Sequence, residues 1–273
     1  MTLKKPKINN KGLPSHKRLS VQISLTGHSF LITHTVTKEV LFFSETSFDH
    51  VTTPQALLEL LKKELHQNNI LEDQFDEIVL VHANDIATVV PSSLFDEQKA
   101  AEYLKFNSKI LATDFITHDQ LNTQELSIVY TPYVNINNFF FETFGSFSYF
   151  HATTKLLDGI INTSNVKLEN SIHLHVFQDH FTCIIIKNSQ LQLCNSYTYK
   201  TPEDFSYYIL FCYEQLGLQP EKDPIILSGA IRENDDLYSQ LFTYVRHIRF
   251  DENTKGLQIK ETPKHIHNII SNL

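Results

Sequence analysis

The chain has 273 residues, of which 41% are hydrophobic and 20% charged, a composition that indicates a globular protein with a sizeable core. No apolar run approaches the ~20 residues of a membrane-spanning helix, and no apolar segment follows the basic N-terminus as it would in a signal peptide. The three cysteines are an odd number without metal-type spacing, which favours a reducing compartment over a disulfide framework. We therefore expect a cytoplasmic protein without a membrane span.

Basic residues are concentrated at the N-terminus. The first 18 residues carry six of the 23 lysines and arginines, so the rest of the chain holds 17 basic and 31 acidic residues, a formal net charge of −14. Such a body repels nucleic acid. The basic tail, residues 1–18, is expected to be flexible and solvated, with RNA, a membrane surface or an acidic partner as alternative contacts.

The chain next predicts a β-meander, a helix and a further strand. Apolar and polar residues alternate over residues 19–43 (LSVQISLTGHSFLITHTVTKEVLFF), as in strands with one buried face. Residues 53–69 (TPQALLELLKKELHQNN) have the pattern of an amphipathic helix, in which Thr53 suits the N-cap and Pro54 the first turn. Residues 77–85 (EIVLVHAND) indicate a buried strand.

The following segment predicts an α+β module. It contains a strand and then a helix from about Asp96, two strands within residues 112–119 and 125–134, and a short helix that ends at Gly145. A strand near residues 146–151 (SFSYFH) then leads into a helix over residues 152–164 (ATTKLLDGIINTS). Inserted modules of this kind usually carry contacts specific to one branch of a fold.

The second half of the chain repeats the order of the first. A meander over residues 171–197, a helix over residues 201–218 that begins with Thr201-Pro202, and a strand over residues 223–230 (DPIILSGA) follow one another. The helices start 148 residues apart and the closing strands 147 residues apart. Three elements in one order at one offset predict an internal duplication, whose unit is a β-meander followed by a helix and a strand.

Two tandem units with a module inserted in the first resemble the actin-like superfamily, in particular its pilus-assembly and cell-division branch. The strings SLTGHSF, PSSLFDE, PYVNINNFF, FGSFSYFHA and YKTPEDFSYYILF also resemble an uncharacterised bacterial family, domain of unknown function 3822. The resemblance implies an α/β fold of duplicated actin-like (ribonuclease H-like) halves. The expected parts are a first half (residues 19–84 and 147–165), an inserted module (85–146), a second half (166–252) and a C-terminal segment (253–273).

In actin-like ATPases the first hairpin of each half carries an Asp-x-Gly turn, in which the aspartate orients Mg²⁺ and water and the glycine lets backbone N–H groups hold phosphates. In the first half of this chain the resemblance places Ser24 at the aspartate position and Thr26 at the glycine position, while Gly27 follows one residue later. The first hairpin therefore lacks the expected carboxylate.

In the second hairpin the aspartate position falls on His175, Val176 or Phe177, and Asp179 lies in the turn itself, where it suits a hairpin. The superfamily also places two glycines beside the adenosine, after the closing strand. This chain has only Gly229, followed by Ala230. The candidate nucleotide-binding residues are therefore fewer than in actin-like ATPases. They are Ser24, Thr26, Gly27, Asp179 and Gly229.

Other chemistries have less support. His173 and His175 point from one face of a strand with His180 nearby, a spacing compatible with a metal, but a packed strand face or surface histidines explain it better. The pair His265 and His267 indicates an exposed segment. No nucleophile elbow, Walker loop, His-Glu-x-x-His or Cys-x-x-Cys motif is present. We predict no catalytic residue and no metal site.

Aromatic residues are dense over residues 139–150 (FFFETFGSFSYF), with seven in twelve positions. Most should belong to the core, but a short helix and a strand cannot easily bury all of them, so an exposed remainder would suggest a protein partner. The candidate partner-binding residues are Tyr133, Phe140, Phe144 and Tyr149.

These observations favour a non-catalytic binding or scaffolding protein on a degenerate actin-like fold. It would need no cofactor and would act with an unidentified protein partner or as a homo-oligomer. The alternative is a nucleotide-binding switch or weak ATPase that holds ATP in the cleft between the halves. A third hypothesis is an RNA contact through the basic tail.

Overall fold

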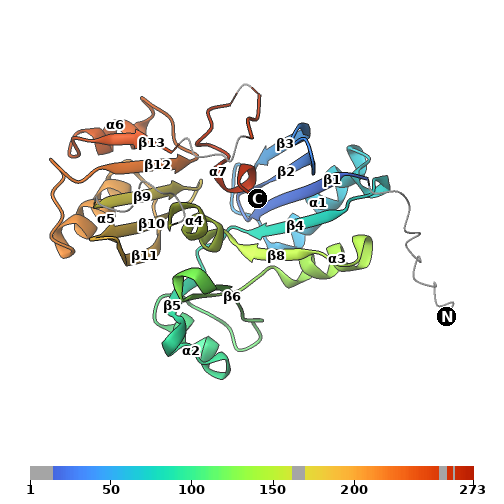
Figure 1. The fold of residues 1–273 in the computed structure, drawn as a ribbon, viewed down its shortest axis with the longest axis horizontal. Helices are drawn as coiled ribbons and strands as arrows, with labels where there is room; N and C mark the ends of the chain where they lie inside the picture. The colour runs from blue at the N-terminus through green and yellow to red at the C-terminus, as the bar shows by residue number, and fades with distance from the viewer. Residues whose placement is uncertain (1–14, 162–169, 252–256, 261) are drawn as a thin grey trace.

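The computed structural model describes residues 15–161, 170–251, 257–260 and 262–273. Figure 1 shows two α/β halves beside one another, with a smaller sheet below them. The strand order is β3-β2-β1-β4-β8 in the first half, β11-β10-β9-β12-β13 in the second and β5-β7-β6 in the smaller sheet. Most of the predicted basic tail, and the predicted boundaries near residues 165 and 252, lie outside the described residues.

The first sheet contains β1 (Lys17–Ser24), β2 (Gly27–His34), β3 (Val40–Ser47), β4 (Glu77–His82) and β8 (Ser148–His151). The first three form the antiparallel meander that the alternation predicts, and β4 and β8 extend the sheet in parallel from β1. Helix α1 (Pro54–Gln67) buries its leucine stripe against β1 and β2. Thr53 Oγ1 accepts from the N–H of Ala56 at 3.2 Å, which confirms the predicted N-cap.

The second sheet contains β9 (Ser171–Val176), β10 (His180–Lys187), β11 (Gln190–Thr198), β12 (Ile225–Gly229) and β13 (Ile248–Phe250). Helix α5 (Pro202–Gln215) packs on it, and Thr201 Oγ1 accepts from the N–H of Asp204 at 3.2 Å, as predicted. Helix α6 (Asp236–Phe242) follows β12. The two large sheets have the same strand order and the same strand directions.

The smaller sheet, in the segment expected to be an inserted module, contains β5 (Ala87–Pro91), β6 (Thr117–Leu121) and β7 (Leu126–Tyr130), and α2 (Ala100–Lys105) lies between β5 and β6 in the chain. The helix expected from about Asp96 begins later, because Asp96 Oδ1 accepts from the N–H of Gln98 at 3.0 Å and starts a single 3₁₀ turn first. Helix α3 (Val134–Phe144) ends at Gly145 as predicted. It packs on the first sheet through Ile136 and Phe140.

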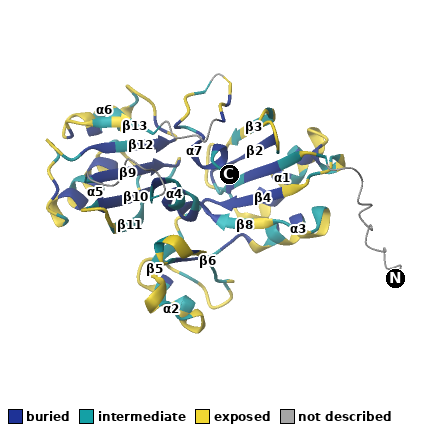
Figure 2. Ribbon diagram, viewed as in Figure 1, coloured by how far each residue is buried: buried dark blue, intermediate teal, exposed yellow. Residues whose placement is uncertain are grey.

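A shared core joins the two halves. Helix α4 (Ala152–Ile161) contributes Leu156 and Leu157, which pack with Val81 of the first sheet and Ile184 of the second. The short helix α7 (Asn268–Ser271) and the C-terminus lie between the halves in Figure 1. Figure 2 shows the central strands of both large sheets buried. Within the described ranges, no helix is both long and apolar enough to cross a bilayer.

Candidate functional site

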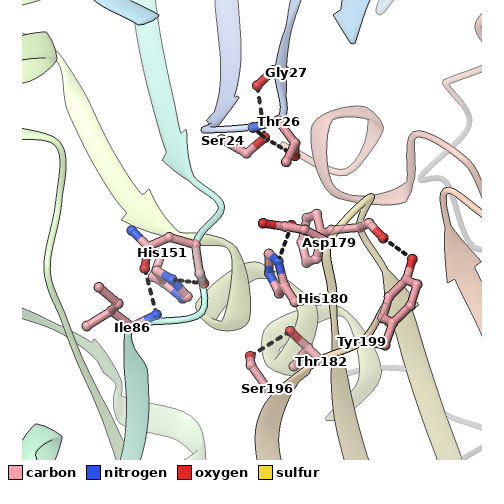
Figure 3. A network of polar contacts seen from close by, with 12 residues as sticks. Ser24, Thr26, Gly27, Ile86, His151, Asp179, His180, Thr182, Ser196 and Tyr199 are labelled. Carbon is pink, nitrogen blue, oxygen red and sulfur yellow. Dashed lines mark hydrogen bonds and ion pairs between the residues drawn. The ribbon is translucent and has the colours of Figure 1, made fainter. Parts of the chain in front are cut away.

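A cavity of about 90 Å³, the cleft cavity, lies between the halves where the β1–β2 turn approaches the ends of β9 and β12. Four of the five predicted nucleotide-binding residues line it, namely Ser24, Thr26, Gly27 and Gly229, whereas Asp179 does not. Figure 3 shows the β1–β2 turn on one side of this region and Asp179 on the other. The fold thus brings together residues that are far apart in the sequence.

The β1–β2 turn is closed by its own hydrogen bonds. Ser24 Oγ donates to the carbonyl of Gly27 at 3.0 Å and accepts from the N–H of Thr26 at 3.2 Å. Thr26 Oγ1 lies 3.0 Å from Ser24 Oγ. A phosphate-binding turn instead directs unused N–H groups at its ligand. The Thr26 N–H is therefore already engaged inside the turn.

Both glycines of the cleft cavity are required by packing of the protein's own backbone. A Cβ on Gly27 would lie 2.5 Å from the carbonyl oxygen of Thr46 on β3. Gly229 has φ +85°, and a Cβ there would collide with the carbonyl oxygen of Val176 on β9. Ala230 N–H donates to that same oxygen at 2.7 Å. Close approach of neighbouring strands accounts for each glycine without a ligand.

The C-terminal segment covers the position at which the actin-like resemblance would place adenosine. The N–H of Gly229 donates to the carbonyl of His265 at 2.8 Å, and His265 Nε2 donates to the carbonyl of Ile231 at 2.8 Å. Ile266 lines the cleft cavity. The expectation that His265 and His267 are exposed is wrong, since each is only 6% exposed. These histidines pack into the region between the halves.

Glu45 is the one carboxylate among the described residues that line the cleft cavity. Burial raises the pKa of Glu45, against the opposing attraction of Arg232. Its Oε1 lies 3.7 Å from His267 Nδ1. Burial, and to a smaller extent the charge of Arg232 and the nearby His265, lower the pKa of His267 to about 4, so His267 is neutral at pH 7. The described residues contain no cluster of three metal-ligating side chains.

Asp179 is a hairpin residue with local partners. Its Oδ1 accepts from His180 Nδ1 at 2.8 Å, and its carbonyl accepts from the N–H of Tyr199 at 3.2 Å. Burial acts to raise the pKa of Asp179, but the hydrogen bond and the charge of His180 together lower it below its ordinary value. The carboxylate is therefore held against β10.

The strand histidines are packed and neutral. His175 Nδ1 lies 2.8 Å from Ser228 Oγ, and His173 Nε2 lies 3.1 Å from Ser171 Oγ. Burial lowers the pKa of His175 to about 3 and that of His173 to about 4. These contacts fit the packed strand face that the sequence favours over a metal site.

The expectation that Tyr133 and Phe140 are exposed for a partner is wrong. Tyr133 is 9% and Phe140 0% exposed, because α3 turns one face toward α1 and β1. Phe144 and Tyr149 are half-buried against the same core. Phe141 is the exposed aromatic residue of this helix, at 65%. Ile136, Phe140 and Phe144 are spaced by four residues and so share one face of a helix, a spacing that could have revealed the burial of Phe140.

Several residues at the interface of the halves were missed from the sequence. Gln178 Nε2 donates to the carbonyl of Phe48 at 2.9 Å and so joins the second half to the first. Glu45 and His267 approach from two distant segments. No spacing in the sequence connects residues on such distant segments. The position of Glu45 near the end of an alternating strand is the one sequence signal that could have placed it at this interface.

The sequence of residues 8–248 matches a family described as Protein of unknown function (DUF3822). This chain belongs to that family. No protein with a curated description matches it. The match confirms the resemblance seen in the sequence strings.

Solved structures similar to the chain share its fold. One is a protein from Bacteroides thetaiotaomicron VPI-5482 with an actin-like ATPase fold and unknown function, at 21% identity and TM-score 0.77, covering 86% of this chain and 91% of that one. Another is a PilM–PilN type IV pilus biogenesis complex, at 9% identity and TM-score 0.58, covering 95% of this chain and 97% of that one. The DUF3822 chain therefore has a mixed α/β, actin-like fold.

Proposed function

We propose that this DUF3822 protein is a non-catalytic binding or scaffolding protein, built from two halves of a duplicated actin-like unit and using no cofactor. The observation that carries the proposal is the hydrogen bond from the Gly229 N–H to the carbonyl of His265, at 2.8 Å. This bond occupies the N–H of Gly229, the backbone donor beside which the actin-like resemblance places adenosine. The protein's own C-terminal segment thereby takes the place of a ligand.

The size and chemistry of the cleft cavity support this proposal. Small-molecule sites usually enclose about 300–1,000 Å³, whereas the cleft cavity measures about 90 Å³. The positions that correspond to the metal-orienting aspartates carry Ser24 in the first hairpin and one of three non-carboxylate residues in the second. A Mg²⁺-dependent hydrolysis would lack both of its usual carboxylates.

The alternative is a nucleotide-binding switch or weak ATPase, and one observation favours it. Four of the predicted residues, Ser24, Thr26, Gly27 and Gly229, line a single cavity between the halves. In this alternative the C-terminal segment would have to leave the cleft before ATP enters. Nucleotide binding would then be coupled to release of that segment.

Thermal melting with and without ATP-Mg²⁺ tests the two functions. A site of micromolar affinity would stabilise the fold by about 4 kcal/mol at millimolar ligand, and we expect no such shift. Ile266→Ala sharpens the test, because it enlarges the cleft cavity and loosens the C-terminal segment. Leu94→Ala, at a 69% exposed residue of the inserted module, is the control. An ATP-dependent rise in the wild-type melting temperature, larger in Ile266→Ala, would establish the switch instead.

The role as a scaffold implies a protein partner or a homo-oligomer. Support comes from the PilM–PilN complex, in which a protein of similar fold is a component of an assembly. The basic tail, residues 1–18, remains our candidate for any contact with RNA. Size-exclusion chromatography with light scattering measures self-association, and affinity purification with mass spectrometry identifies a partner. A strictly monomeric protein that captures nothing above a control resin would contradict the scaffold.

A further inference from the structure

A second cavity, of about 290 Å³, lies at the opposite end of the second sheet from the cleft cavity. We call it the basic pocket, and its lining residues are Asn170, Lys222, Asp223, Pro224, His247 and Arg249. Asn170, Pro224 and His247 directly precede β9, β12 and β13, which run in parallel. The pocket is thus at the amino ends of these strands, whereas the cleft cavity is at the carboxyl ends of β9 and β12. In Figure 1 this sheet is on the left.

The basic side chains of this pocket have no acidic partner within the part of the chain that the structure describes. Among the described residues, no ion pair or hydrogen bond engages the side chains of Lys222, His247 or Arg249. Asp223 is the one carboxylate of the lining, and both of its oxygens are already used. Its Oδ1 accepts from Asn170 Nδ2 at 3.1 Å and its Oδ2 from the N–H of Gln219 at 2.6 Å. Because both donors are neutral, Asp223 keeps its charge, and the described lining carries two positive side chains, Lys222 and Arg249, against one negative one, on a body whose net charge is negative.

The walls of the pocket are fixed before any ligand arrives. Tyr213 Oη donates to the carbonyl of Asp223 at 2.8 Å, which ties the loop before β12 to α5. The N–H of Ile225 donates to the carbonyl of His247 at 2.9 Å, and the N–H of Arg246 to the carbonyl of Pro220 at 3.0 Å. A rigid frame lowers the entropic cost of binding, because only the ends of Lys222 and Arg249 need to become ordered.

We propose that the basic pocket binds a multivalent oxyanion, a phosphate or diphosphate group on a small soluble molecule. Arginine offers a planar pair of donors that matches two phosphate oxygens, and lysine adds a compact charge. The volume is at the lower limit for small-molecule sites. It therefore suits a phosphorylated small molecule better than a large ligand. The proposed scaffold function is independent of this site.

Isothermal titration calorimetry with inorganic pyrophosphate tests the assignment in a low-salt buffer. We expect saturable binding at one site per chain. Lys222→Gln and Arg249→Gln should each weaken it about tenfold or more, since each removes a charged hydrogen-bond donor. The matched control is Lys63→Gln, which removes an exposed lysine of α1 and should leave the affinity unchanged. Melting temperatures of all three variants verify that they fold.

Absence of saturable binding would overturn the proposal, as would an equal loss of affinity in Lys63→Gln, since that would mark a general charge effect. A sedimentation assay with vesicles of phosphatidic acid and phosphatidylcholine distinguishes the source of the phosphate. Binding to pyrophosphate without sedimentation supports a soluble ligand. Sedimentation that disappears in Arg249→Gln would overturn the soluble source and assign the pocket to a lipid headgroup.

Discussion

Replacing Gly229 by alanine tests whether this glycine serves packing of the protein itself. Its φ of +85° disfavours an L-residue, at a cost of about 1–2 kcal/mol. The added Cβ would also lie 2.9 Å from the backbone nitrogen of Val176 and still closer to its carbonyl oxygen, so the end of β12 must move away from β9. That movement breaks the hydrogen bond from Ala230 to Val176 and the one from Gly229 to His265. Each contributes about 1 kcal/mol.

The expected loss of stability for Gly229→Ala is therefore about 3–4 kcal/mol, or about 10 °C in melting temperature. Urea denaturation and thermal melting without nucleotide measure it. Gly159→Ala in α4 is the matched control, because no atom outside its chain neighbours and the adjacent backbone of α4 lies within 4 Å of its added Cβ. Alanine is the better helix former there and should stabilise the protein by about 0.5–1 kcal/mol. A Gly229→Ala protein that melts within about 2 °C of wild type would refute the packing argument.

Two further predictions concern acid stability and the aromatic helix. Burial lowers the pKa of His82 to about 4 and those of His151 and His175 to about 3. Below pH ~6.5 the unfolded chain binds protons that the folded one does not, so these three histidines alone should lower stability by about 4 kcal/mol per pH unit toward pH 4, and the lowered pKa values of His173 and His267 add to this loss. Urea titrations at pH 7, 6 and 5 measure this, and equal midpoints would contradict it. Phe140→Ala should cost about 3–5 kcal/mol, whereas Phe141→Ala, at 65% exposure, should change stability by less than about 0.5 kcal/mol. Similar losses in both variants would show that the assigned helix face is wrong.

Local patterns predicted much of the fold. The Thr-Pro pairs at residues 53–54 and 201–202 mark helix starts because capping depends on a few neighbouring residues. Strand alternation likewise follows from one buried face, and it located both meanders. The start of α2 was placed too early, since Asp96 caps a 3₁₀ turn with the same chemistry that caps a helix.

The candidate sites depended more on contacts between distant segments. Gly229 could be aligned with a glycine position, but its contact with His265 joins residues on separate segments that no periodicity connects. Lys222, His247 and Arg249 meet because they lie in or beside the starts of neighbouring parallel strands. Sequence order alone does not reveal that arrangement. Residues that act through tertiary proximity were therefore the ones that sequence analysis missed.

The course of the C-terminal segment has a consequence for the timing of folding. His265 binds the second half through Gly229, while His267 packs on Phe43 and Ile270 on Leu31 in the first half. These residues leave the ribosome after both large sheets have been synthesised. Since domains tend to fold in order of synthesis, each sheet can form before this segment exists. The contacts of this segment with both halves would then form after each sheet, and they would reinforce an orientation that the shared core through α4 already sets.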